Sequence, residues 1–262
     1  MALKIAVCVK AVPDTETKIA ISADKKNIDY TGVRFITSPY DEFAIEEALK
    51  LKEKHTGDTT VISLGGAECT DVLRDSLARG IDAAVHLSDP DFASLDTLST
   101  AKVLAAAIKD GGYDLVLCGH QAAGGDNSQV PAMLAELLDW AQTTMVLKLE
   151  VEGTTFKAER EIEGAHESVE GSLPAVISTQ KGLNEPRYPG IKGVMAARRK
   201  EIAVKDATAL GVKGSVGGEQ LKVRIKEMML PPDRPQGRKI EGDMDAQVKE
   251  LVSLLHSEAH VL

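Results

Sequence analysis

The segment Asp114-Leu-Val-Leu-Cys118, followed by Gly119-His-Gln-Ala-Ala-Gly-Gly-Asp-Asn-Ser-Gln-Val130, is the stretch that decides the fold. Its first five residues are short and apolar, as in a strand buried inside a parallel sheet. A Gly-rich loop follows, and a helical apolar period runs from Ser128 to Leu138. A strand, a Gly-rich turn and a helix in this order predict a parallel sheet covered by helices.

The same alternation extends back to the N-terminus. Short apolar runs and helical segments are expected in turn at Lys4–Lys10, Asp41–His55, Thr59–Leu64, Glu68–Arg79, Ala83–Leu87 and Leu95–Lys109. Ser38 is expected to cap the first helix with its hydroxyl, and Pro39 to occupy its first position. Together with the strand at Asp114–Cys118, these runs predict a core of four parallel strands.

After Trp140 the pattern changes to one typical of an antiparallel sheet extension. The expected strands are Thr144–Val151, Thr155–Ile162, Glu167–Gly171 and Leu173–Thr179. A Gly- and Pro-rich arm then covers Lys181–Arg199, where Met195–Arg199 could begin a short helix. The tail ends in a helix at Met244–His256, and a tail that cannot build its own core is expected to wrap a partner.

Composition and charge narrow the classes of partner. The 262 residues are 43% hydrophobic and carry a net charge of -9, which disfavours nucleic acid and anionic lipid. Only four Tyr, four Phe and one Trp are present, so a nucleotide would be held mainly by backbone and small polar groups. No apolar run approaches the roughly 20 residues that cross a bilayer. A strand begins almost at once after Met1, and we therefore expect a cytoplasmic protein without membrane insertion.

The Gly-rich loop is placed where a phosphate would bind. Glycines let the backbone approach a ligand closely, and a helix N-terminus presents free N–H groups. A second turn at Ser63–Glu68 and the strand end Cys8-Val9-Lys10 should meet it at the carboxyl edge of the sheet, which favours a mononucleotide. The loop is neither a Walker loop nor Gly-x-Gly-x-x-Gly, so a plain strand-to-helix turn stays open as the alternative.

No catalytic or metal-binding set emerges from the remaining polar residues. The six histidines are scattered, and the three cysteines form no CxxC pair. Cys8 and Cys118 lie in apolar runs and are interpreted as small buried hydrophobes. The acids Glu159 to Glu163 alternate as on one solvated strand face, while Arg198-Arg199-Lys200 is either a solvated patch or a docking site for an acidic protein.

Several segments resemble, in family order, the beta subunit of electron-transfer flavoproteins. They are Val9-Lys10, Asp41-Glu-Phe-Ala-Ile-Glu-Glu-Ala-Leu-Lys-Leu-Lys-Glu53, Asp114-Leu-Val-Leu-Cys-Gly-His-Gln-Ala122 with Leu138-Asp-Trp140, Arg160-Glu-Ile-Glu-Gly164 with Leu173-Pro-Ala-Val176, and Asn184-Glu-Pro-Arg-Tyr188. The resemblance implies an α/β fold with a Rossmann-like parallel-sheet nucleotide-binding domain of the adenine nucleotide alpha hydrolase-like type, an antiparallel extension and an extended C-terminal arm. It implies an AMP-binding domain at 1–205, with a recognition loop at 184–200, and an arm at 206–262 that wraps an alpha subunit.

The resemblance also implies a function. The alpha subunit would hold most of an FAD, which takes electrons from acyl-CoA-type dehydrogenases of fatty acid beta-oxidation and passes them to a membrane quinone oxidoreductase or another acceptor. The beta subunit would bind AMP structurally, dock the dehydrogenase and supply no catalytic side chain. The AMP contacts transferred from the family are Cys8, Ser38, Pro39, Tyr40, Asp41, Leu64, Gly119, His120, Gln121, Ala122, Ala123, Gly124, Gly125, Asp126, Asn127, Ser128, Gln129 and Val130.

Docking residues implied by the resemblance are Tyr188, Ile191 and Met195, with Ile191 at the position of an anchoring Leu. Glu161 aligns with an acid near the moving flavin domain. The run Gly124–Val130 leans toward electron-bifurcating relatives that bind a second FAD in place of AMP, although AMP is favoured. A stand-alone nucleotide-binding regulatory protein is the alternative from another class, and a hydrolase or ligase would lack a base or metal set.

Overall fold

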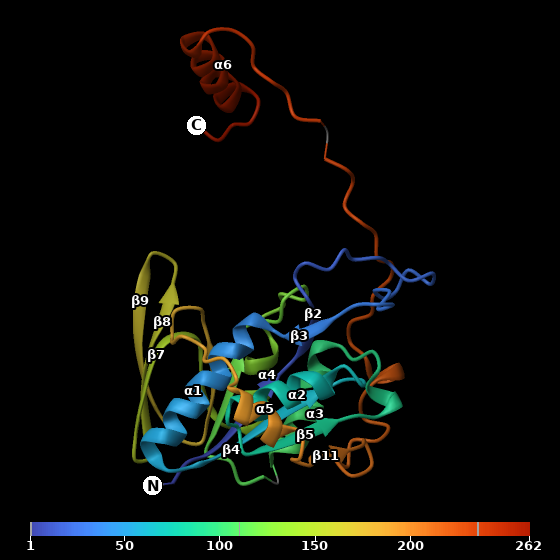
Figure 1. The fold of residues 1–262 in the computed structure, drawn as a ribbon, viewed down its shortest axis with the longest axis vertical. Coiled ribbons are helices and arrows are strands. Elements are labelled where there is room, and N and C mark those ends of the chain that lie inside the picture. The colour runs from blue at the N-terminus through green and yellow to red at the C-terminus, as the bar shows by residue number, and fades with distance from the viewer. Residues whose placement is uncertain (1, 110, 235) are drawn as a thin grey trace.

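A mostly parallel sheet organises the chain. The computed structural model describes residues 2–109, 111–234 and 236–262, and within them it has one sheet of nine strands and a separate two-stranded ribbon (Figure 1). The order in the large sheet is β11 (Ile202–Lys205), β5 (Ala83–Leu87), β4 (Asp58–Leu64), β1 (Lys4–Val9), β6 (Leu115–Gly119), β10 (Ala175–Thr179), β7 (Ala141–Glu152), β8 (Thr155–Ile162) and β9 (Ala165–Ser172). The ribbon pairs β2 (Ala11–Pro13) with β3 (Phe35–Thr37). The predicted α/β class is confirmed.

The sheet holds more parallel strands than the pattern predicted. β10 lies between β6 and β7 and is parallel to both, so its expected place in an antiparallel extension was wrong. β7 has β10 as a parallel neighbour, with pairs from Ala141 to Val146, and β8 as an antiparallel neighbour, with pairs from Val146 to Glu152. A register shift interrupts the β10 pairing next to Met145, whose φ is +59°. β8 and β9 are antiparallel, as predicted. β10 is buried along its whole length, which is the environment of a central parallel strand.

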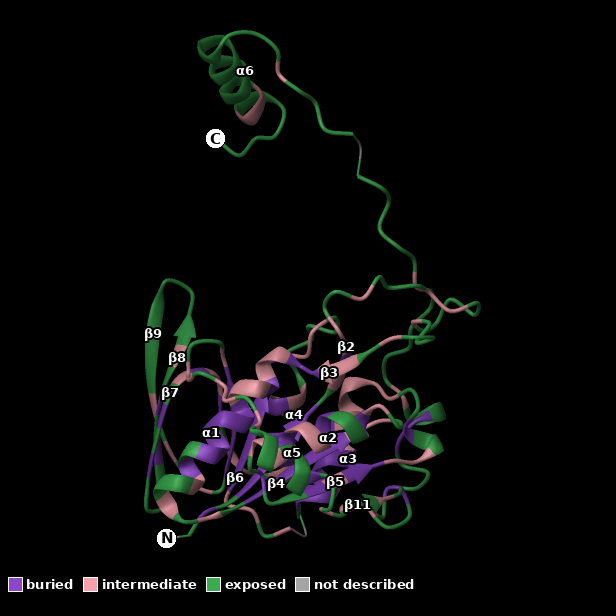
Figure 2. Cartoon of the chain, viewed as in Figure 1, coloured by how far each residue is buried: buried purple, intermediate pink, exposed green. Residues whose placement is uncertain are grey.

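Helices cover both faces of the sheet. One face packs against α1 (Pro39–His55), α2 (Cys69–Arg79) and α5 (Ile191–Ala197), and the other against α3 (Thr97–Lys109) and α4 (Val130–Leu138). Residues of β1 and β6 alternate between these two cores, because successive side chains on a strand point to opposite faces. Figure 2 shows the purple buried residues concentrated in this three-layered body.

The start of α1 differs from the predicted capped helix. Pro39 does open the helix, but the Ser38 hydroxyl caps none of its N–H groups and instead accepts from the Ala123 N–H at 3.4 Å. Asp41, which the family resemblance implies as a nucleotide contact, is buried, and its carboxylate is turned toward the strands. The first turn of α1 is therefore built to hold the neighbouring loops.

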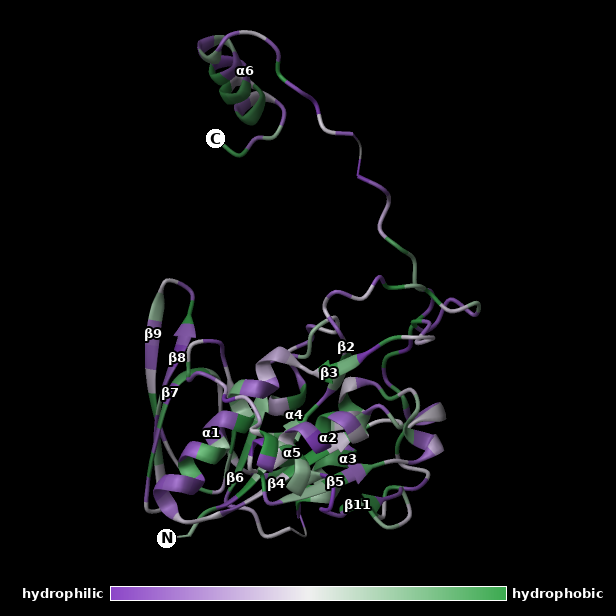
Figure 3. Ribbon diagram, viewed as in Figure 1, coloured by the Kyte–Doolittle hydropathy of each residue, from purple (hydrophilic) through white to green (hydrophobic). Residues whose placement is uncertain are grey.

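The C-terminal part of the chain first packs against the body and then leaves it. Ala207, Val212 and Val216 are buried in the α3 and α4 core, and the Met228 N–H still donates to the Lys25 carbonyl. Beyond Leu230 the chain extends away and ends in α6 (Met244–Ser257), where no described residue is buried (Figure 1). Figure 3 shows hydrophobic green patches on this exposed helix. Among the helices of the described chain, none is both long and apolar enough to cross a membrane.

Candidate functional site

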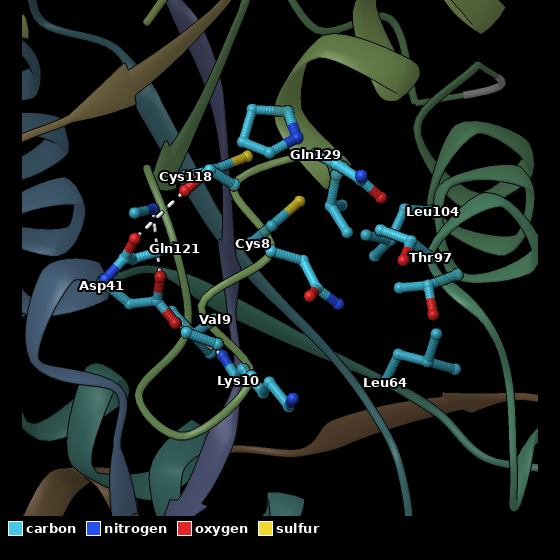
Figure 4. A pocket seen from close by; sticks show the side chains of 18 of the residues that line it. Cys8, Val9, Lys10, Asp41, Leu64, Thr97, Leu104, Cys118, Gln121 and Gln129 are labelled. Carbon is cyan, nitrogen blue, oxygen red and sulfur yellow. Dashed lines mark hydrogen bonds between the residues drawn. The ribbon is translucent and has the colours of Figure 1, made fainter. Parts of the chain in front are cut away.

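A cavity of about 350 Å³ opens at the carboxyl edge of the sheet. Its floor comes from the ends of β1 and β6, one side from the loop Gly119–Val130, and the opposite side from Phe92 to Leu104. The 3-10 turn η1 (Pro90–Phe92) and the first turns of α3 carry that second side. Figure 4 shows side chains from both sides pointing toward a common space. Its volume falls at the lower end of the roughly 300–1,000 Å³ typical of small-molecule sites.

Hydrogen bonds between its own side chains order the loop Gly119–Val130. The Gln121 amide donates to Asp126 at 3.1 Å and accepts from the Ser128 hydroxyl at 3.0 Å. Gly124, Asp126 and Ser128 all have left-handed φ values, of +82°, +48° and +52°. These contacts and turns fix the shape of the loop, and the cavity lies open beside it.

Asp41 connects the three segments that form the floor. Its carboxylate accepts from the Lys10 N–H at 2.7 Å and from the Gly119 N–H at 3.0 Å, which joins α1 to the ends of β1 and β6. Burial raises the pKa of Asp41 to about 7, and the two backbone N–H donors and the Lys10 charge oppose that rise only in part. Asp41 thus positions the floor and takes up a proton in the neutral range.

Asp41 should give the ligand-free chain an unusual pH dependence. Its pKa rises from 3.8 in the unfolded chain to about 7 in the folded one, so folding takes up a proton between these values. The contribution of Asp41 to stability is present at low pH and is lost as pH rises, by at most about 1.4 kcal/mol per pH unit. The free energy of unfolding in urea should fall with rising pH between these two pKa values in the wild type, and this fall should be missing in Asp41→Asn. Parallel curves would contradict the assignment.

Most of the residues predicted for nucleotide contact surround this one cavity. Thirteen of the eighteen line it: Cys8, Asp41, Leu64, Gly119, His120, Gln121, Ala122, Gly125, Asp126, Asn127, Ser128, Gln129 and Val130. The other five, Ser38, Pro39, Tyr40, Ala123 and Gly124, are not among the lining residues. Two of these support the loop from behind. The Ser38 hydroxyl accepts from the Ala123 N–H, and the Tyr40 ring lies edge-on to the His120 ring, with 4.1 Å between the ring centroids. Nucleotide contact by these residues stays a prediction.

The far wall was missed by the sequence interpretation. It consists of Phe92, Ala93, Leu95, Thr97, Thr100 and Leu104. These residues follow β5, a strand that had been predicted, and the carboxyl ends of parallel strands share one edge. The rule that places the carboxyl ends of β1, β4 and β6 at one edge also places the end of β5 there, so it predicts this wall as well.

The second Gly-rich turn does not offer the free N–H groups that were expected of it. The Gly66 N–H donates to the Glu68 carboxylate at 2.8 Å, so a side chain of the same turn already occupies the place of an anion. Lys10 lies on the other side of the floor, and its Nζ is 3.8 Å from where a Cβ on Gly125 would stand. His120 Nδ1 is buried and has no partner among the described residues. Free polar groups therefore gather at the Gly119–Val130 side.

The predicted recognition loop is fastened to α1. Arg187 forms a bidentate pair with Glu46, at 2.8 Å for both Nε and Nη2, and also reaches Glu53. The Asn184 amide donates to the Phe43 carbonyl at 3.0 Å and to the buried Glu47 at 2.9 Å. Glu46 and Glu47 are buried although they are charged, and this clasp is the reason.

Beyond the clasp the loop exposes apolar side chains. Tyr188 is 92% exposed, Ile191 83% and Met195 59%. The short helix predicted from Met195 begins earlier, at Ile191, and it packs closely on α2, because a Cβ on Gly193 would stand 2.2 Å from the Ala78 carbonyl oxygen. The loop thus presents an exposed apolar surface on a fixed base.

Arg187→Gln should destabilise the chain by about 2 kcal/mol. Breaking a buried pair costs roughly 3–5 kcal/mol, and the 36% exposure of the Arg187 side chain reduces that figure. Lys157→Gln is the matched control, because its pair with Glu170 is exposed on both sides and should be worth at most about 1 kcal/mol. Denaturant midpoints measure both, and equal shifts would show that the clasp does not stabilise the fold.

Two further expectations concern the rest of the surface. Glu161 lies on the exposed β8–β9 hairpin, opposite His166, so its side chain is free to meet another protein. In the described parts of the chain, no group of three or more His, Cys, Asp or Glu side chains is arranged to hold a metal ion.

Comparison with known proteins places this architecture in a family. The model of the electron transfer flavoprotein domain matches residues 27–210. The subunit beta of the electron transfer flavoprotein from Bacillus subtilis is 41% identical over 261 residues, covering 99% of this chain and 100% of the relative. The chain belongs to the electron transfer flavoprotein beta-subunit family.

Other members of the family match over similar lengths. The subunit beta from Thermoanaerobacterium thermosaccharolyticum is 38% identical over 99% of this chain and 100% of its own, and that from Homo sapiens is 36% identical over 95% and 98%. The part that the family model matches includes both the Gly119–Val130 loop and α5. The docking surface on α5 and most of the cavity lining of this beta-subunit chain therefore lie in the matched region, whereas Cys8, Val9 and Lys10 of the cavity precede it.

Proposed function

We propose that this chain is the beta subunit of a heterodimeric electron carrier, binds AMP in the cavity for structural reasons, and docks a flavin dehydrogenase through α5. The observation that carries the proposal is the cavity itself, with an open Gly-rich loop on one side and an apolar wall on the other. The FAD, held mainly by an alpha subunit, supplies the redox chemistry by accepting and donating electrons. The residues of this chain provide binding and geometry.

The donor set of the cavity fits an adenylate. The backbone of Gly125–Ser128 and the Lys10 ammonium would hold the phosphate, and Phe92, Leu95 and Leu104 offer an apolar surface for the base. The unpartnered His120 Nδ1 is a further polar atom at this edge. The modest volume favours a mononucleotide over a second FAD, which would be the ligand of a bifurcating complex.

The surface of α5 fits the docking of a dehydrogenase. Ile191, the proposed anchor residue, and Met195 supply an exposed apolar surface. Positive charge surrounds this surface, from Lys192, Arg198 and Arg199. On the C-terminal side, α6 carries exposed Met244, Val248, Leu251 and Val252 at helical spacing. We propose that this stripe on α6 binds the alpha subunit. The electrons held by the flavin would pass onward to a quinone oxidoreductase or another acceptor.

Identifying the small molecules released on denaturation tests the proposal. The heterodimer should release one FAD and one AMP, measured by chromatography and mass spectrometry. Release of two FAD and no AMP would replace the proposal by a bifurcating complex. A stable monomer that releases a nucleotide but carries no flavin partner would favour the stand-alone regulatory protein.

Gly125→Val should weaken AMP binding by on the order of tenfold, since crowding a packed site costs roughly 1–3 kcal/mol. Without ligand the new side chain has room, because its Cβ would meet only Ala122 and Lys10 at 3.8 Å. Gly237→Val is the control, as nothing lies within 4 Å of a Cβ there. Calorimetric titration of AMP into the nucleotide-free chain measures both. Unchanged affinity in Gly125→Val would favour the plain turn.

A further inference from the structure

Two of the three cysteines oppose each other on the floor of the cavity. Cys8 on β1 and Cys118 on β6 are paired directly in the parallel register. Both belong to the core on the α3 and α4 side, so their side chains lie on the same face of the sheet. Both also line the cavity, and Figure 4 shows the two sulfur atoms facing the same space.

The spacing of the strands suits a bond between these sulfurs. Neighbouring strands lie about 4.7–4.9 Å apart, which falls within the roughly 4.4–6.8 Å between Cα atoms of a disulfide. The neighbouring Cys8 thiol and burial raise the pKa of Cys118 well above its ordinary value, so Cys118 remains a neutral thiol. Cys69 differs, since it is buried in the first turn of α2 on the other side of the sheet.

We propose that Cys8 and Cys118 form an oxidisable dithiol that closes to a disulfide across the floor of the cavity. The oxidant is a peroxide that enters through the cavity mouth. Cys8, as the thiolate, attacks the peroxide and becomes a sulfenic acid with release of water. The Cys118 thiol then attacks the sulfenic sulfur, and the S–S bond forms with loss of a second water. Two S–H bonds are lost, and two electrons reduce the peroxide.

Closure has a consequence for the cavity. The bond would fix the ends of β1 and β6 close to where Asp41 also joins them, because Cys8 lies two residues before Lys10 and Cys118 directly precedes Gly119. A ligand that covers the floor would also cover both sulfurs. This part rests on the proposed AMP site, whereas the formation of the disulfide does not.

Peroxide treatment of the purified full chain tests the dithiol. Two of the three thiols should be lost together, the mass should fall by two hydrogens, and digestion should release a cross-linked peptide pair containing Cys8 and Cys118. A reductant should restore both thiols. Cys69→Ala should behave as wild type, and Cys118→Ala should give no cross-link.

Two results would overturn the dithiol. The first is oxidation or alkylation of Cys8 and Cys118 one at a time, without a cross-link. The second is loss of the Cys69 thiol at the same rate as the thiols of Cys8 and Cys118. Both results can be measured on the wild-type chain. Preloading with AMP should slow cross-linking. Equal rates with and without AMP would count against AMP on this floor, while the cross-linked peptide would still establish the dithiol.

Discussion

Ile191→Ala should slow reduction of the bound flavin by an acyl-CoA dehydrogenase without changing the flavin content. Ile191 begins α5, is 83% exposed and stands on a helix that packs closely against α2. Truncating an anchor of this kind costs roughly 2 kcal/mol or more, which corresponds to about a 30-fold loss of docking affinity. Stopped-flow reduction over a range of dehydrogenase concentrations measures it.

The matched control is Val204→Ala. Val204 is also an exposed apolar residue, at 65%, but it lies on the edge strand β11. Its replacement should leave the concentration dependence unchanged. Equal slowing in the two variants, or in neither, would contradict α5 as the docking surface.

Gly119→Ala should destabilise the chain by about 3 kcal/mol, at the upper end of the usual cost of overpacking. A Cβ there would stand 2.4 Å from Asp41 Oδ1 and 2.8 Å from the Tyr40 backbone carbon. The Asp41 carboxylate would have to move, and the partly buried N–H of Lys10 and the buried N–H of Gly119 would lose their acceptor.

Urea midpoints compare this variant with Gly125→Ala, in the same loop, where an added Cβ has only ordinary contacts and stability should change by at most about 0.5 kcal/mol. A small effect at Gly119 would show that the floor adapts, and the positioning role of Asp41 would then be wrong.

Local patterns predicted the elements well wherever periodicity and chain breaks agree. β1, β4, β5 and β6 and the helices between them lie within a few residues of the expected ranges. The sequence also predicted that the Gly-rich loop lies next to Cys8, because both are at the carboxyl ends of parallel strands and these ends share one edge of the sheet.

Pairing and burial by distant residues could not be predicted in this way. Ala175–Thr179 has the composition of any buried strand, and nothing within it indicates that it enters between β6 and β7. Glu46 is charged, and nothing in its local sequence predicts that Arg187, 141 residues away, buries it. Asp41 has a favourable place in the first helical turn, and only the approach of β1 and β6 makes it a floor residue.

The position of β10 has a consequence during synthesis on the ribosome. The first 119 residues supply β5, β4, β1 and β6, and these strands can pair as soon as they leave the ribosome. The second neighbour of β6 is β10, which is complete only when Thr179 has been synthesised. Until then the outer edge of β6 carries unpaired N–H and C=O groups beside wholly apolar surfaces, a combination that promotes association between nascent chains. A pause in translation within residues 120–175 would prolong this exposure, and chaperone demand should be greatest for chains of that length.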